Sequence, residues 1–182
     1  MKIVLSLFLT LSCILVSGQE NRYQISEVIE VENSTSNELY LRGRQWFISS
    51  FNDSNSVIQL DDPEKGIIIG KGHFSYEPTI FSGSDLTRGK VNFIISLEFK
   101  DGRYRYTIKD FTHFGKIGTD TDFGTITQDI EFPYGKSLEG GQKWKSKIWK
   151  DIKIQVSDNS NKIINSLKES MIVSSITSDD DW

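Results

Sequence analysis

The sequence predicts an α+β domain in which one antiparallel sheet packs against two helical elements. Two hairpin signals and a helical C-terminal region support this prediction. The Asp- and Pro-rich turn at residues 61–66 and the Asp101-Gly102 pair each separate two runs of mostly apolar residues, and tight turns of this kind join antiparallel strands. With a strand and a helix ahead of them, the expected order is β-α-β-β-β-β-α. This order gives a curved, five-stranded antiparallel sheet with both helical elements on one face.

The first 18 residues have the pattern of a secretory signal peptide. Lys2 supplies a positive charge, residues 3–16 are almost wholly apolar, and Val16-Ser17-Gly18 offers short residues for cleavage before Gln19. The apolar run is shorter than the roughly 20 residues that a permanent transmembrane anchor needs. We therefore expect an exported protein with no transmembrane segment in the mature chain.

Cys13 is the only cysteine of the chain, and it lies inside this leader. Cleavage before Cys13 would give a lipoprotein. Against this, Thr10 stands where such sites usually carry Leu, and the apolar run continues beyond the cysteine, so we favour the ordinary cleavage. The mature chain would then hold no cysteine, which excludes disulfides, thiolate catalysis and zinc–thiolate sites.

The mature chain is expected to form one domain at residues 19–176, followed by a frayed acidic tail at residues 177–182. The chain has 21 Lys and Arg against 25 Asp and Glu, a formal net charge of −4. Removal of the leader with Lys2 makes it more acidic still. Because phosphate backbones favour clustered Lys and Arg, this balance argues against a nucleic-acid partner.

The first strand is expected at residues 23–31, where apolar residues at odd positions alternate with polar ones. Glu27 falls on the apolar side, which predicts a short or bulged strand. An amphipathic helix follows, to about Phe51. Thr35 and Glu38 have the spacing of a capping box at its start, in which the hydroxyl and the carboxylate satisfy free backbone N–H groups.

The four middle strands are expected at residues 56–60, 67–76, 91–99 and 103–114. The last of them changes phase near Asp110, after which Phe111 and His113 share a parity, and this predicts a β-bulge. Gly70 and Gly72 lie on one face of the strand expected at residues 67–76. Two glycines on one face indicate either a helix packed close above the strand or strong local bending.

Residues 115–141 form a long irregular segment with six glycines, of a kind that is either mobile or functional. The C-terminal helical region contains Ser157-Asp158-Asn159-Ser160, residues that compete for backbone hydrogen bonds, so a division into two helices at this point stays open beside a single helix. The helical prediction rests on apolar residues at four-residue spacing, namely Ile148, Ile152, Val156, Ile163, Leu167 and Met171.

Three stretches carry a family resemblance: Ser36-Asn37-Glu38-Leu39-Tyr40 through Trp46, Gly66 to Gly72, and the hairpin from Val91 to Phe114 with its charged Lys100-Asp101-Gly102-Arg103 tip. In these stretches the chain resembles an exported, Bacteroidetes-type bacterial domain of unknown function with a TBP-like fold. The resemblance covers about Tyr23 to Met171. It implies a two-layer TBP-like domain in a periplasmic or cell-surface setting, and no activity comes with it. The family name refers to shape alone, so DNA binding is not implied.

No catalytic or cofactor motif stands out, since the sequence holds no serine-centred elbow, H-E-x-x-H or C-x-x-C pattern. His73 and His113 would lie two strands apart, roughly 10 Å, too far to share a metal without other ligands. We expect both to be solvated on a sheet face. Asp120-Thr121-Asp122 lacks the alternation and the terminal Glu of an EF-hand loop, and the glycines of residues 66–72 lack phosphate-loop spacing. We assign no catalytic residue, metal ligand or cofactor.

A sheet face left uncovered by the helices, with His73, Arg103, Arg105 and aromatic residues on it, is the best candidate for a binding surface. The favoured function is a non-catalytic binding or interaction module of the bacterial envelope, with an unknown envelope protein or small ligand as partner. Two alternatives stay open. One is an envelope hydrolase with a site near residues 115–141, and the other is a structural envelope component without a small ligand.

Overall fold

The structure is a computed structural model, and it describes residues 21–51, 57–78, 80, 84–119, 121–133 and 141–172. The predicted leader at residues 1–18, with Cys13, and the predicted tail at residues 177–182 lie outside the described residues.

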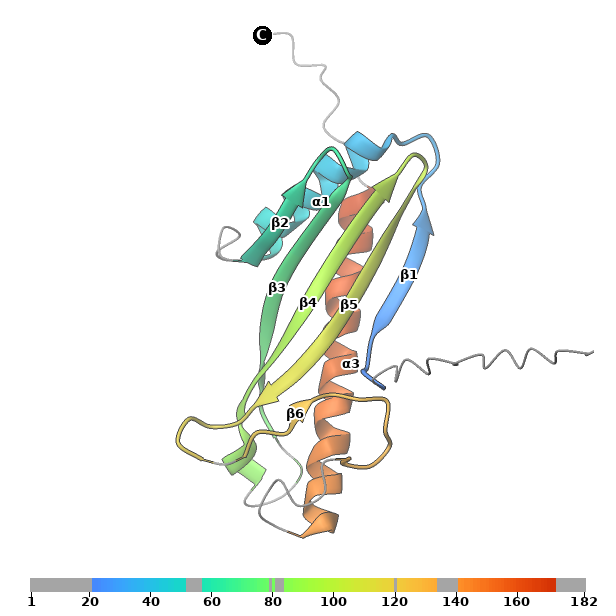
Figure 1. The fold of residues 1–182 in the computed structure, drawn as a ribbon. Coiled ribbons are helices and arrows are strands. Elements are labelled where there is room, and N and C mark those ends of the chain that lie inside the picture. Colours follow the sequence, from blue (N-terminus) through green and yellow to red (C-terminus); the bar gives the residue numbers. More distant parts are fainter. Residues whose placement is uncertain are drawn as a thin grey trace, which may run out of the picture.

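One antiparallel sheet forms the centre of the fold. Its order is β2-β3-β4-β5-β1, with β6 pairing the end of β5, and the long central strands curve along their length (Figure 1). The sequence did not predict β6. The strands are β1 (Ile25–Glu30), β2 (Ile58–Asp62), β3 (Ile67–Tyr76), β4 (Gly89–Lys100), β5 (Arg103–Phe114) and β6 (Gly124–Thr125).

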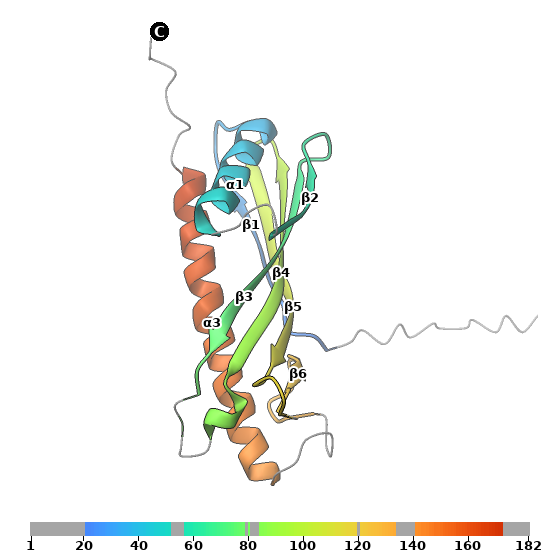
Figure 2. The ribbon, with the colours of Figure 1, turned by 90° about the vertical axis from the view of Figure 1, so that its left-hand side faces the viewer.

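Two long helices, α1 (Ser36–Ser50) and α3 (Gln142–Ile172), pack on the same side of this sheet, and the 3-10 helix η1 (Ser84–Thr87) leads into β4. Figure 2 shows the sheet edge-on, with α1 and α3 on one side and no helix on the other. The predicted two-layer α+β arrangement is therefore confirmed.

The hydrophobic core lies between the sheet and the two helices. β4 alternates as predicted, so every second side chain from Val91 to Phe99 is buried. Burying such side chains stabilises the fold by roughly 1.5–3 kcal/mol each. The helices meet this surface with Leu39, Trp46, Phe47, Ile148, Trp149, Ile152, Val156, Leu167 and Met171.

Local signals set the position of α1. Thr35 accepts a hydrogen bond from the Glu38 backbone N–H at 3.2 Å, and the Glu38 carboxylate accepts from the Thr35 N–H at 2.8 Å, which confirms the capping box. The helix then packs close to the sheet. A Cβ added to Gly70 would lie 2.5 Å from the ring of Phe47, so the glycine is required by a helix packed directly above it.

The predicted bulge in β5 is present at Asp110. This residue has a φ of 57°, and the β4–β5 register shifts between Asn92 and Ile94. The extra residue reverses the parity of the strand, which turns Phe111 and His113 toward the helices.

The structure decides three details of the predicted elements. α3 is a single helix of 31 residues, not two, because buried Val156 and Ile164 on either side of the polar stretch hold it against the sheet. β2 starts at Ile58, two residues later than expected, and extends to Asp62. β1 is shorter than residues 23–31, the first of the two outcomes that the position of Glu27 predicted. It pairs with β5 without a bulge, since Glu27 is accommodated on the helix side by hydrogen bonds from Tyr106 and Lys168.

Candidate binding face

The open face is the side of the sheet opposite α1 and α3. Successive side chains of a strand point to opposite faces of the sheet, so the residues that alternate with the buried core positions point to this side. The open face is built from Ser26, Val28 and Glu30 of β1, Lys71, His73 and Ser75 of β3, Lys90, Asn92, Ile94, Ser96, Glu98 and Lys100 of β4, and Arg103, Arg105, Thr107 and Lys109 of β5.

A small hollow of about 240 Å³ lies on this face near the β4–β5 turn, and both predicted arginines line it. Arg105 binds Glu98 across the strands through two hydrogen bonds, from Nη2 at 2.5 Å and from Nε at 3.2 Å. Glu98 raises the pKa of Arg105 further above its ordinary value by this contact. Arg103 lies 4.0 Å from a carboxylate oxygen of Glu30. Both guanidinium groups are therefore already matched by acids of the chain.

A second, larger groove of about 710 Å³, here called the lower groove, lies on the open face at the end away from the β4–β5 turn. The strands contribute its floor, and the segment that follows β5 forms a wall. Its lining residues include His73, Ser75, Arg88, Lys90, Asn92, Phe114, Lys116, Ile117 and Asp122.

The three predicted site residues do not meet in one place. Arg105 pairs with Glu98, whereas His73 pairs with Asn92, six positions away along β4. At about 3.3 Å per residue this separation is roughly 20 Å. His73 is exposed as expected, and it lines the lower groove without contributing to the hollow beside Arg103.

Lysines are the part of this face that the sequence reasoning missed. Lys71 is paired with Ile94, and Ile94 with Lys109, so the two lysines flank one isoleucine in a row across three strands. Lys90 lies farther along β4, and Lys116 lines the lower groove. Strand parity could have placed the three strand lysines here, because each falls on the polar side of its alternation.

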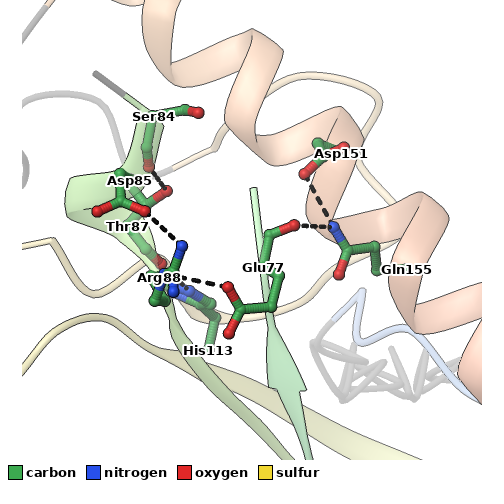
Figure 3. Close-up of polar contacts among 8 residues, drawn as sticks. All are labelled: Glu77, Ser84, Asp85, Thr87, Arg88, His113, Asp151 and Gln155. Carbon is green, nitrogen blue, oxygen red and sulfur yellow. Dashed lines mark hydrogen bonds and ion pairs between the residues drawn. The ribbon is translucent and has the colours of Figure 1, made fainter. Parts of the chain in front are cut away.

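His113 corrects the expectation of a solvated sheet histidine. Its side chain is fully buried, on the face opposite to His73, because the bulge turns it inward. Nδ1 accepts a hydrogen bond from the Phe123 N–H at 3.1 Å. Nε2 lies 3.0 Å from the carbonyl oxygen of Thr87 (Figure 3). Burial lowers the pKa of His113 from 6.5 to about 4. The two histidines of the chain therefore cannot share a ligand.

A polar cluster fastens α3 to the end of β3 behind the lower groove. The Tyr76 hydroxyl donates to Asp151 over 2.7 Å, and burial raises the pKa of this tyrosine well above its ordinary value. Gln155 donates both to the Glu77 carbonyl at 3.0 Å and to Asp151 at 3.2 Å (Figure 3). Arg88 in turn binds Glu77 at 3.0 Å. These contacts are internal, and they hold the groove in shape.

The acids at residues 115–133 cap backbone and side-chain donors. Asp122 accepts from the Gly115 N–H at 2.7 Å, and Asp129 accepts from Asn21 and Thr127. Asp120 lies outside the described residues. Within the described part of the chain, no group of three or more His, Cys, Asp or Glu side chains could hold a metal ion. The hydrolase alternative gains no support from these contacts.

None of the helices that the structure describes is both long enough and apolar enough to cross a bilayer.

Fold and face together define the class: a two-layer α+β protein of TBP-like fold, with a curved antiparallel sheet whose second face is covered by no helix among the described residues. Residues 26–114 match the model of a domain of unknown function with TBP-like fold, DUF4468, and this stretch of the chain belongs to that family. The family and the TBP-like fold inferred from the sequence are thereby confirmed.

Solved structures agree with this fold. A TBP-like protein from Parabacteroides distasonis ATCC 8503 is 13% identical, with a TM-score of 0.56 over 81% of this chain and 94% of that one. A DUF4468 family protein from Bacteroides ovatus ATCC 8483 is also 13% identical, with a TM-score of 0.58 over 83% and 86% of the two chains. At this identity the likeness shows the fold alone. No curated protein matches the chain.

Proposed function

We propose that this protein is a non-catalytic binding module of the bacterial envelope and that the open face is its binding surface. The observation that carries the proposal is the lower groove of about 710 Å³ on a sheet face that neither helix covers. Placement in the envelope rests on the export pattern of the leader.

A bare face by itself is ordinary, because antiparallel sheets often expose one side to water. The groove adds a concave surface of mixed chemistry. Phe114 is 38% exposed and Ile117 fully exposed, beside the polar and basic groups of Ser75, Asn92 and Lys90. Concave sites that combine apolar surface with a few polar groups are the usual form of ligand sites.

The proposal is tested by lysine acylation followed by mass spectrometry, on intact envelopes and on the purified protein. If the open face is covered in its native setting, Lys71, Lys90 and Lys109 react several-fold more slowly in envelopes than in the purified protein. Lys150 and Lys162, exposed on α3, are the matched controls and should react equally in both. Equal reactivity of all five lysines, or protection on α3 alone, would overturn the proposal.

A further inference from the structure

We propose that the open face binds an extended acidic polypeptide segment, whose carboxylates contact a lysine track formed by Lys71, Lys90, Lys109 and Lys116. This inference rests on the proposed binding function and names the chemistry of its partner.

The track has the dimensions of an extended peptide. Lys71 and Lys109 are two strands apart with Ile94 between them, about 10 Å between their Cα atoms. Lys90 lies four residues from Ile94 along β4, roughly 13 Å at the rise of a strand. Lys116 continues the track into the wall of the lower groove. A segment of about five extended residues would span the distance from Ile94 to Lys90, and further residues would reach Lys116.

The charge of the track is uncompensated. None of its four lysines forms an ion pair with any residue that the structure describes. The neighbouring arginines differ, because Arg88, Arg103 and Arg105 each lie within 4.0 Å of a carboxylate. In a chain of net charge −4, the open face therefore presents unpaired positive charge, which complements an acidic partner.

The kind of cation favours carboxylates over phosphates. Guanidinium groups match phosphate through paired hydrogen bonds, but the arginines of this face are already engaged by Glu30, Glu98, Asp85 and Glu77. The free groups are lysine ammoniums, which act as point charges.

Apolar side chains between the lysines favour a polypeptide. Ile94 lies half-buried between Lys71 and Lys109, and Phe114 and Ile117 are exposed at the groove. A peptide can offer aliphatic side chains to these positions and carboxylates to the lysines. A sulfated polysaccharide or a phosphodiester chain has no aliphatic side chains with which to cover the isoleucines.

The test uses a short fluorescein-labelled peptide in which Glu and Leu alternate, with fluorescence anisotropy at low and high salt. We expect saturable binding that weakens as salt rises. The K71Q/K109Q variant should bind about fivefold more weakly, since each exposed ion pair contributes little alone. The K150Q/K162Q variant on α3 is the matched control and should bind like the natural chain. Circular dichroism of both variants confirms that they are folded.

Different failures have different meanings. Unchanged binding by K71Q/K109Q, or an equal loss in K150Q/K162Q, overturns the lysine track. Tighter, lysine-dependent binding of a single-stranded oligonucleotide, a sulfated polysaccharide or phosphatidylglycerol vesicles overturns the polypeptide assignment. If none of these probes binds while the envelope footprint still protects the open face, this inference fails and the binding function stands. Absence of both binding and protection removes both.

Discussion

The backbone N–H of Phe123 donates a hydrogen bond to Nδ1 of His113 over 3.1 Å, in a site from which water is excluded. Because Nδ1 accepts this bond, the imidazole proton sits on Nε2 and is donated to the Thr87 carbonyl at 3.0 Å. One neutral tautomer thus joins the end of β5 to η1 and to the segment before β6. A second proton on Nδ1 would remove the Phe123 bond and bury a charge.

The first prediction is a loss of stability in acid due to His113. Its pKa is about 4 in the folded chain against an ordinary 6.5, so between these values the unfolded chain binds a proton that the folded chain does not. Stability from this group is complete above about pH 6.5 and is lost as the pH falls toward about 4, by roughly 3 kcal/mol in total. Urea unfolding across this range measures it.

The matched variants for this test are His113→Gln and His73→Gln. His73 is exposed on the other face of the sheet, so its variant is the control that leaves the buried site of His113 intact. The His113 variant should be less stable at neutral pH and lose that part of the slope which the histidine supplies. A natural chain and a His113 variant with the same slope would disprove the assignment.

His113 also illustrates what the sequence could and could not predict. The phase change near Asp110 predicted the bulge, and parity put Phe111 and His113 on one side. Whether that side of β5 is exposed to solvent depends on Phe123 and Phe132. Both come from the irregular segment after β5, where Phe123 packs against His113 and Phe132 packs against Phe123. Contacts so distant from any periodic element leave no local signal.

The candidate site shows the same division. Alternation placed His73, Arg103 and Arg105 on the uncovered face, and the structure has them there. The separation of His73 from Arg105 by roughly 20 Å and the pairing of Arg105 with Glu98 depend on strand register, which the hairpin turns fix only once both strands are positioned. The capping box of α1, a purely local feature, was correct in both of its hydrogen bonds.

The second prediction concerns Gly89 at the start of β4. A Cβ added there would lie 1.9 Å from the carbonyl oxygen of Phe114, a backbone atom that cannot turn aside. Gly89→Ala should therefore force β4 and β5 apart at the groove and lower the free energy of unfolding by about 3 kcal/mol. Chemical denaturation measures the change.

Gly141→Ala serves as the control for this substitution. A Cβ at Gly141 would meet nothing within 4 Å, and as the residue before α3 it should lose no more than about 1 kcal/mol through the poorer N-cap preference of alanine. If the two alanine variants were equally stable, the close approach of Phe114 to Gly89 would be refuted.

The third prediction contrasts two buried tyrosines. Tyr76→Phe removes the donor to Asp151 and should cost roughly 1.5–3 kcal/mol, the range for hydrogen bonds to charged groups. Tyr104 is also buried, but its hydroxyl has no partner among the described residues. Tyr104→Phe should be neutral or stabilising, because it removes a buried polar group that makes no bond. Thermal and urea unfolding of the pair compare the two effects, and a larger loss for Tyr104→Phe would contradict them.

The last prediction follows from the continuity of α3 through its polar stretch. Ser160 faces the core there, fully buried, and its hydroxyl has no partner in the part of the chain that the structure describes. Ser160→Ala removes this hydroxyl and introduces the best helix former, so it should raise the free energy of unfolding by about 0.5–1 kcal/mol. Ser166→Ala is the opposite case on the same helix, because Ser166 accepts from the buried indole N–H of Trp46 at 3.1 Å. Its loss leaves that N–H unpaired and should cost about 1–2 kcal/mol. Opposite signs for the two serine-to-alanine changes are expected because the buried Ser160 hydroxyl makes no hydrogen bond with the described residues whereas Ser166 accepts one, and a destabilised Ser160→Ala variant would show that the Ser160 hydroxyl has a partner.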